Sequence, residues 1–237
     1  MTRNWAAAIA LASLLAAGCG QSDTSATELQ RAPAEKAQAS PAPAPAPAPP
    51  RIVFLGDSLT AGYGLNKEES VPSLIQARLD ASGYQYEAIN AGVSGDTSAG
   101  GLRRLDWSLE GNVAVLVIEL GANDGLRGLP VPAMKKNLAE IITRAQQRGI
   151  TVILTGMEAP PNYGAAYTAE FRQAFRDLAR EHQVAFVPFY LEGVAGIASL
   201  NIADGIHPNP AGARIVEKTM WRALEPVLTK STASSTR

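Results

Sequence analysis

The sequence predicts an α/β fold in which a parallel sheet is covered by helices on both faces. From Arg51 onward, short apolar runs alternate with segments whose apolar residues recur at helical spacing. The clearest run, Val113 to Leu120, is nearly all β-branched or leucine, which is typical of a strand buried on both faces. Alternation of this kind joins parallel strands through helical crossovers. The predicted strands are residues 52–55, 84–90, 113–120, 150–154 and 184–187.

The segments between these strands have the spacing of amphipathic helices. From Val71 to Leu79, for example, apolar residues recur on one face of a helix. The last helix begins at Asn209-Pro210, where asparagine supplies a capping side chain and proline suits the first turn. The predicted helices are residues 71–79, 97–109, 134–145 and 167–182, followed by the one that begins at residue 210.

Composition limits both the architecture and the function. The chain has 237 residues that are 46% hydrophobic, and its core-forming segments make a single domain, residues 51–230. The net charge of −1 gives no electrostatic reason to expect a nucleic-acid partner. A single cysteine excludes an intrachain disulfide, a CxxC redox pair and a multi-cysteine zinc site. No zinc or calcium motif is visible, so we expect no metal and no cofactor, and we expect a monomer.

Residues 1–18 have the pattern of a signal peptide. Arg3 precedes an apolar run that is short for a membrane span, which needs roughly 20 residues. The run ends at Cys19 in a sequence that resembles a bacterial lipobox, although Ala16 replaces the usual larger aliphatic residue. An ordinary secretory signal that leaves a free thiol is the alternative. We expect an exported bacterial lipoprotein, anchored to a membrane through a lipid on Cys19, with its folded domain in the periplasm or at the cell surface.

Residues 19–50 are predicted to be a tether between the anchor and the domain. They lack apolar periodicity and end in an alternating Pro-Ala tract from Pro41 to Pro50, which favours polyproline II. Ten such residues reach roughly 31 Å at about 3.1 Å each. The tract could instead be a ligand for a partner domain, but a spacer is the simpler interpretation. Residues 231–237 are expected to form a disordered tail.

A serine follows the first predicted strand directly, in Gly56-Asp57-Ser58-Leu59. Because ligands bind beyond the carboxyl ends of strands in parallel sheets, Ser58 is a candidate nucleophile. An isolated Gly-Asp-Ser is more often a helix N-cap or a turn. The sequence also lacks the G-x-S-x-G elbow of other serine hydrolases. If Ser58 is the nucleophile, a general base elsewhere in the chain must remove the proton of its hydroxyl.

The chain has two histidines that could act as this base. His182 lies at the end of a predicted helix, where a histidine usually only meets solvent or the helix dipole. His207 lies in a loop three residues after Asp204, a spacing that lets the carboxylate bind one ring nitrogen and fix the tautomer. A plain loop histidine is the alternative for His207. We predict that His207 is the base and that Asp204 orients it.

Two further residues could stabilise an oxyanion. Gly95 follows the second strand, where the missing side chain lets its backbone N–H approach a substrate. Asn123 follows the third strand and can offer its side-chain amide. Each alone is equally typical of a turn or loop. Ser94 is a rival nucleophile, but nothing beside it suggests activation.

Together these pieces resemble the SGNH (GDSL) hydrolase family. The matching motifs, in chain order, are Gly56-Asp57-Ser58-Leu59, Gly95, Gly121-x-Asn123-Asp124 and Asp204-x-x-His207. Residues 90–98 and 121–128 resemble in particular the bacterial branch of acyl-CoA thioesterase I, lysophospholipase L1 and arylesterase. The resemblance spans roughly residues 51–228. It implies a flavodoxin-like three-layer α/β/α sandwich that hydrolyses carboxylic esters through a serine and without a metal.

The resemblance also implies a role for each site residue. Ser58 would be the nucleophile, His207 the base and then the acid, and Asp204 the residue that orients His207. The oxyanion hole would consist of the Ser58 N–H, the Gly95 N–H and the Asn123 amide.

The substrate is less constrained by the sequence. Leu126, Leu129 and Val131 follow Asn123 and are predicted to line an apolar subsite, although they could equally be core residues. An exported enzyme would meet lysophospholipids, short-chain esters or aryl esters rather than cytoplasmic acyl-CoA. A carbohydrate O-acetylesterase of the same family is one alternative. An exported small-molecule binding protein, in which no acyl-enzyme would form, is the other.

Overall fold

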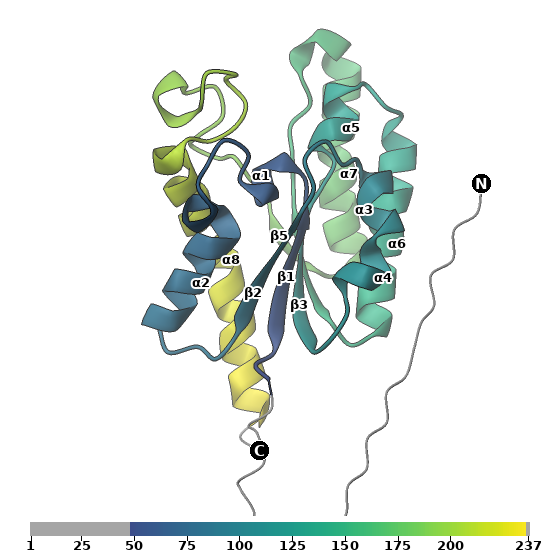
Figure 1. The fold of residues 1–237 in the computed structure, drawn as a ribbon. Helices are drawn as coiled ribbons and strands as arrows, with labels where there is room; N and C mark the ends of the chain where they lie inside the picture. Colours follow the sequence, from purple (N-terminus) through teal and green to yellow (C-terminus); the bar gives the residue numbers. More distant parts are fainter. Residues whose placement is uncertain (1–47, 236–237) are drawn as a thin grey trace, which may run out of the picture. The chain divides into compact units, whose positions relative to one another are not determined.

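A parallel sheet of five strands forms the centre of the domain (Figure 1). The structure is a computed structural model, and it describes residues 48–235. The strand order is β2-β1-β3-β4-β5, and each neighbouring pair is parallel. The predicted signal peptide, Cys19 and most of the predicted tether lie outside the described residues. The strands are β1 (Arg51–Gly56), β2 (Glu87–Gly92), β3 (Val113–Glu119), β4 (Thr151–Thr155) and β5 (Ala185–Val187).

Helices cover both faces of this sheet and complete three layers (Figure 1). On one face α2 (Val71–Ala81) packs against α8 (Pro210–Ser235). On the other face α6 (Val131–Gln147) packs against α3 (Ser98–Arg103) and α7 (Ala165–His182). This arrangement confirms the predicted α/β/α sandwich. The shorter helices are α1 (Ser58–Ala61), α4 (Leu105–Ser108) and α5 (Ala122–Leu126), with 3₁₀ turns η1 (Lys67–Glu69), η2 (Pro161–Tyr163) and η3 (Ala198–Leu200).

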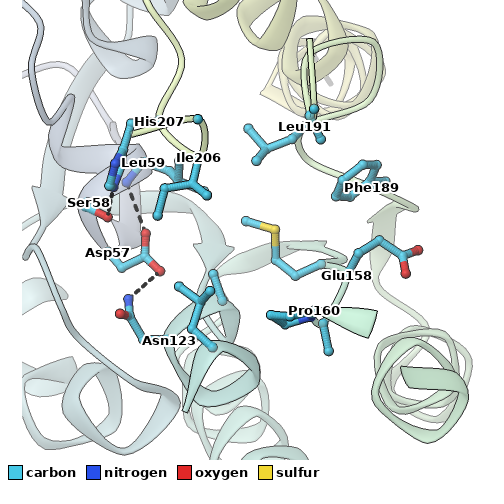
Figure 2. Close-up of a pocket in the computed structure, with 17 residues that line it drawn as sticks. Asp57, Ser58, Leu59, Asn123, Glu158, Pro160, Phe189, Leu191, Ile206 and His207 are labelled. Atoms are coloured by element: carbon cyan, nitrogen blue, oxygen red, sulfur yellow. Dashed lines mark hydrogen bonds between the residues drawn. The ribbon is translucent and has the colours of Figure 1, made fainter. Parts of the chain in front are cut away.

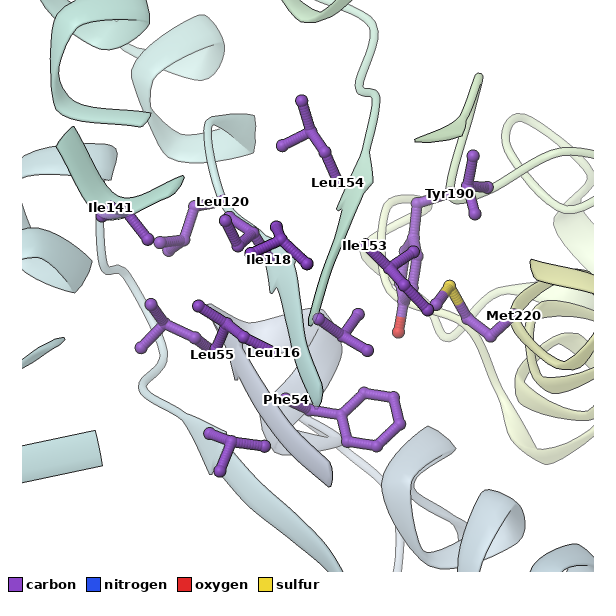
Figure 3. Packing of buried hydrophobic residues seen from close by; sticks show 14 of the residues in the cluster. Phe54, Leu55, Leu116, Ile118, Leu120, Ile141, Ile153, Leu154, Tyr190 and Met220 are labelled. Atoms are coloured by element: carbon purple, nitrogen blue, oxygen red, sulfur yellow. The ribbon is translucent and has the colours of Figure 1, made fainter. Parts of the chain in front are cut away.

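The strands are buried on both faces, as their apolar composition predicts. Residues 52–55 of β1 are all buried, so successive side chains enter the core on opposite faces of the sheet. Leu116 and Ile118 of β3 lie in the same cluster (Figure 3). Full burial of such a side chain contributes about 1.5–3 kcal/mol, and this packing fixes the sheet edge that carries the site. The predicted apolar face of α6 is buried throughout, at Met134, Leu138, Ile141, Ile142 and Ala145.

Two elements differ from the sequence prediction. The pattern predicts a strand at 84–90, whereas β2 begins at Glu87, where its pairing with β1 begins. Residues 97–109, predicted as one helix, form α3 and α4 with a break at Arg104. The Gly100-Gly101 pair lies in α3 and gives this segment a low helix propensity.

The last helix is longer than expected. α8 begins at Pro210, and the Asn209 side chain accepts hydrogen bonds from the backbone of Ala211 and Gly212, which confirms the predicted cap. The helix contains Pro226 and continues to Ser235, although a disordered tail was expected from residue 231. Within residues 48–235, no helix is both long enough and apolar enough to span a bilayer.

Candidate active site

The carboxyl edge of the sheet brings residues from distant parts of the chain together (Figure 2). Ser58 directly follows β1, whereas Asp204 and His207 lie in the loop before α8. His207 Nε2 lies 2.8 Å from Ser58 Oγ, and His207 Nδ1 lies 2.6 Å from Asp204 Oδ2. Both distances are those of hydrogen bonds. A carboxylate, an imidazole and a hydroxyl therefore form one connected chain.

The end of β1 determines how Ser58 is presented. The strand ends at Gly56, where a Cβ would collide with the side chain of Thr60. Asp57 then caps α1, because its Oδ1 accepts a hydrogen bond from the backbone N–H of Leu59 at 3.0 Å. The N-cap is thus Asp57, and the interpretation of Ser58 as a capping serine is wrong. Ser58 is the first residue of α1, so its backbone N–H has no intrahelical acceptor.

The loop before α8 keeps Asp204 ionised beside the imidazole. Asp204 Oδ1 accepts hydrogen bonds from the backbone N–H groups of Ile206 at 3.0 Å and His207 at 3.1 Å. The Ile206 N–H, together with the contacts from His207, lowers the pKa of Asp204 to about 2. An ionised Asp204 favours the tautomer with a proton on Nδ1, which leaves Nε2 to accept the proton of Ser58. The ring of Tyr63 lies against the imidazole, with 4.7 Å between the ring centroids.

The second histidine lies at the other edge of the sheet. His182 ends α7, and the chain then enters β5 at Ala185, so this residue is at the amino edge. Its backbone carbonyl accepts a hydrogen bond from Gln146. This placement agrees with the prediction that His182 is a helix-end residue and leaves His207 as the base in reach of Ser58.

Asn123 lies next to the nucleophile, on α5. Its Nδ2 donates a hydrogen bond to Asp57 Oδ2 at 3.0 Å, and both residues line the same cavity as Ser58 (Figure 2). Burial raises the pKa of Asp57 to about 6, while the Leu59 N–H and the Asn123 amide lower it. An amide has two N–H donors. With one directed to Asp57, the other is available to a ligand in the cavity.

Gly95 lies in the turn that follows β2. Its φ of +84° is in the left-handed region that favours glycine, and its carbonyl accepts a hydrogen bond from Arg127 at 2.8 Å. Gly95 is not among the residues that line the cavity beside Ser58, so its role in the oxyanion hole stays a prediction. Ser94 is exposed in the same turn, and the hydrogen bond of His207 goes to Ser58 instead.

Arg104 positions this turn, and the sequence did not reveal it. The guanidinium donates to Asp96 Oδ2 at 2.6 Å, to the Ala91 carbonyl at 2.6 Å and to the Gly56 carbonyl at 2.7 Å. One partly buried cation therefore connects the turn that contains Gly95 with the end of β1. In the sequence nothing separates Arg104 from its neighbour Arg103.

A mostly apolar cavity of about 310 Å³ extends from the Ser58–His207 pair (Figure 2). Leu126 lies in its wall, as predicted. Leu129 and Val131 do not line the cavity, because the chain turns at Gly128. The Leu129 carbonyl accepts a hydrogen bond from the Tyr167 hydroxyl, and Val131 begins α6 as a buried core residue. The predicted subsite is thus corrected to Leu126 alone.

The rest of the wall was missed by sequence reasoning. It comes mainly from segments after β4 and β5 and from the loop before α8, and its larger apolar members are Met157, Pro160, Phe189, Leu191 and Ile206. The rule that ligands bind beyond the carboxyl ends of strands could have found the first four. Their apolar character alone could not, because it is equally typical of a core.

Comparison with known proteins shows the family to which the domain belongs. The model of the GDSL-like Lipase/Acylhydrolase family matches residues 54–215, which include Ser58 and His207. This chain belongs to that family. It is 43% identical over 178 residues to the protein named Esterase TesA of Pseudomonas aeruginosa, covering 75% of this chain and 89% of that protein.

Two further proteins are similar to this chain over most of the domain. The protein named Thioesterase 1/protease 1/lysophospholipase L1 of Escherichia coli K12 is 33% identical, over 75% of this chain and 84% of that one. The crystal structure of the psychrotrophic esterase EstA from Pseudoalteromonas, inhibited by monoethylphosphonate, aligns with a TM-score of 0.72 and 37% identity, over 76% of this chain and 98% of EstA. The fold of EstA therefore covers most of the described domain.

Proposed function

We propose that this chain hydrolyses carboxylic esters through an acyl-enzyme on Ser58. The observation that carries the proposal is the 2.8 Å contact between Ser58 Oγ and His207 Nε2, with Asp204 on the opposite ring nitrogen. This is the arrangement in which an imidazole removes the proton of a serine hydroxyl during attack. Relatives named esterase and thioesterase/lysophospholipase support the same reaction class.

The reaction proceeds in two halves. Ser58 Oγ attacks the ester carbonyl carbon while its proton moves to His207 Nε2, and a tetrahedral oxyanion forms. The Ser58 N–H, the Asn123 amide and the Gly95 N–H donate to that oxygen. The proton on His207 then passes to the leaving alcohol as the C–O bond breaks. In the second half a water takes the place of the alcohol, which releases the acid and restores Ser58.

The cavity favours an apolar acyl group of medium length. Its volume is about 310 Å³ and it begins at Ser58, so an acyl chain several carbons long has room beside the nucleophile. Met157, Phe189 and Leu191 give it an apolar surface that a sugar would not match. Medium-chain esters, lysophospholipids and acyl thioesters are therefore the substrate class that we favour over O-acetylated carbohydrate.

A substrate series tests this assignment. Rates on aryl acetate, on aryl esters of four to sixteen carbons, on lysophospholipid and on palmitoyl-CoA should peak at medium chain length. Acetylated xylan provides the carbohydrate arm, and faster deacetylation of xylan than of any lipid ester would replace the proposal with the O-acetylesterase alternative.

Covalent labelling tests the nucleophile independently of the substrate. A fluorophosphonate probe should label the wild-type protein and Ser94→Ala but not Ser58→Ala. Labelling of Ser58→Ala, or no labelling of the wild type, would contradict the mechanism, and the second result would favour a binding protein.

We further propose that the enzyme is exported and anchored to a membrane through Cys19. The short apolar run and the lipobox-like sequence before Cys19 support this. Cells that express the full chain should incorporate labelled palmitate into the protein, and Cys19→Ser should abolish incorporation. Equal labelling of the two would contradict the anchor.

A further inference from the structure

Two buried carboxyl groups, Asp57 and Glu119, lie at the turn that carries Ser58. Asp57 lines the cavity and accepts a hydrogen bond from the Asn123 amide, whereas Glu119, the last residue of β3, is not among the residues that line it. Glu119 is fully buried, at 0% exposure. Burying an acid at the end of a central strand has a high desolvation cost, which hydrogen bonds must offset.

One oxygen of Glu119 collects three donors from the nucleophile turn. Glu119 Oε2 accepts from the backbone N–H of Asp57 at 3.3 Å, from the Thr60 N–H at 3.2 Å and from Thr60 Oγ1 at 2.8 Å. These donors flank Ser58 on both sides. The end of β3 therefore fixes the turn that carries the nucleophile, across a separation of about sixty residues in the sequence.

The surroundings of Glu119 favour its neutral form. Within the described residues, Glu119 Oε1 is buried and accepts no hydrogen bond, so no donor stabilises a negative charge on that oxygen. Burial raises the pKa of Glu119 well above its usual range, and the neighbouring Asp57 raises it further. Asp57 has the Leu59 N–H and the Asn123 amide to stabilise its anion, and it is the more acidic of the two.

We propose that Glu119 is a positioning residue for the oxyanion hole. Its neutral carboxyl group fixes the turn from Asp57 to Thr60 and, through Asp57, directs the amide of Asn123 toward the substrate oxygen. A neutral group performs this task without adding a second negative charge beside a developing oxyanion. This inference rests on the proposed ester hydrolysis.

The titratable groups that face this pair come from two other segments. Tyr190, after β5, has a buried hydroxyl whose pKa is raised well above its usual range by burial and by the two acids. His207 interacts with Asp57 through its charge, and Thr60 donates to Glu119. Tyr190 is neutral at working pH, so Asp57 and His207 are the charged groups that a charge on Glu119 would face.

Glu119→Gln is the first test, assayed with an aryl ester. Glutamine keeps the shape, its carbonyl accepts the three donors and its amide replaces the carboxyl O–H. We expect kcat within about threefold of the wild type and no movement of the acid limb of kcat/KM against pH. If Glu119 were instead ionised, its removal would shift that limb to lower pH by about one unit, and the proposal would fail.

Glu119→Met is the second test, because it removes the acceptor while keeping the length of the side chain. Without this acceptor the Asn123 amide should point away from the substrate oxygen, which should lower kcat by about 10- to 100-fold with little change in KM. The upper end of this range is the loss expected when one oxyanion donor is removed. Thr155→Val is the matched control: Thr155 is a buried residue at the end of β4 whose hydroxyl donates to the Ile118 carbonyl. Its kcat should stay at the wild-type value even where its melting temperature falls.

A folded Glu119→Met variant with full kcat would refute the positioning role. If this variant does not fold, the pH profile of Glu119→Gln decides alone. Fluorophosphonate labelling of wild-type Ser58 tests the proposed ester hydrolysis separately from the role of Glu119. If the wild-type protein is not labelled, ester hydrolysis is refuted rather than the positioning role of Glu119.

Discussion

Asp57 and Asp204 are identical side chains at the two ends of the Ser58–His207 pair, and the fold gives them opposite properties. Asp57 is adjacent to the nucleophile and 1% exposed, and burial raises its pKa to about 6. Asp204 contacts the base, its side chain is 35% exposed, and the Ile206 N–H lowers its pKa to about 2.

The difference shows that local donors and solvent, rather than residue type, decide what a carboxyl group does in a site. Asp204 remains an anion at every working pH and provides His207 with a constant partner. Asp57 titrates close to the working range, so the amide that it directs becomes sensitive to pH. Each variant below breaks or sharpens this contrast.

Removing the charge of Asp204 should have the largest effect. Asp204→Asn cannot stabilise the imidazolium and can favour the wrong tautomer of His207, so we expect kcat to fall by about 10²- to 10⁴-fold. Asp80→Asn, an exposed carboxylate on α2, is the control and should keep wild-type kcat. Steady-state kinetics on an aryl ester measure both, and a loss of less than about threefold in Asp204→Asn would remove Asp204 from the mechanism.

Asp57→Asn should reduce activity less. The asparagine keeps an acceptor for the Leu59 N–H but presents an amide to the amide of Asn123, which loses its hydrogen bond. We expect kcat to fall by about 10- to 100-fold, within the range for a displaced oxyanion donor. Unchanged kcat would show that Asn123 needs no direction from residue 57.

The same variant tests the buried charge through stability. Because the folded-state pKa of Asp57 is raised from 3.8 to about 6, the folded protein binds this proton more tightly than the unfolded chain. Its contribution to stability is present below pH 3.8 and is lost as the pH rises to about 6. The melting temperature of Asp57→Asn relative to wild type should therefore increase between pH 4 and pH 7, and a constant difference would contradict the raised pKa.

Much of this site could be predicted from the sequence, because the chemistry follows the strands directly. Ser58 comes two residues after β1, and Asp204 and His207 lie three residues apart, so short-range spacing carries their relation. The alternation of strands and helices gave the layers for the same reason: both periods are local.

What the sequence did not predict depends on contacts between distant elements. Glu119 reads as the polar end of a strand, and Arg104 as one of two adjacent arginines, until the fold places each against the end of β1. Val131 and Phe189 are both apolar, yet one enters the core and the other lines the cavity. Only the packing of α6 and of the segment after β5 separates these outcomes.

Substitution of Tyr63, an uncharged neighbour of His207, should have the smallest effect on kcat among these variants. Its effect is the reference against which the larger effects of the charged residues are judged. The ring of Tyr63 lies 4.7 Å from the imidazole ring and is 53% exposed, so it can stabilise an imidazolium by a cation–π contact of about 0.5–1 kcal/mol. Tyr63→Ala should thus lower kcat by about two- to fivefold, and Tyr63→Phe, which keeps the ring, should restore it. Trp107→Ala, an exposed aromatic on α4, is the control without a site contact. If Tyr63→Ala matched Asp204→Asn in size, ring packing rather than the carboxylate would hold the base, and the contrast between the two aspartates would lose its meaning.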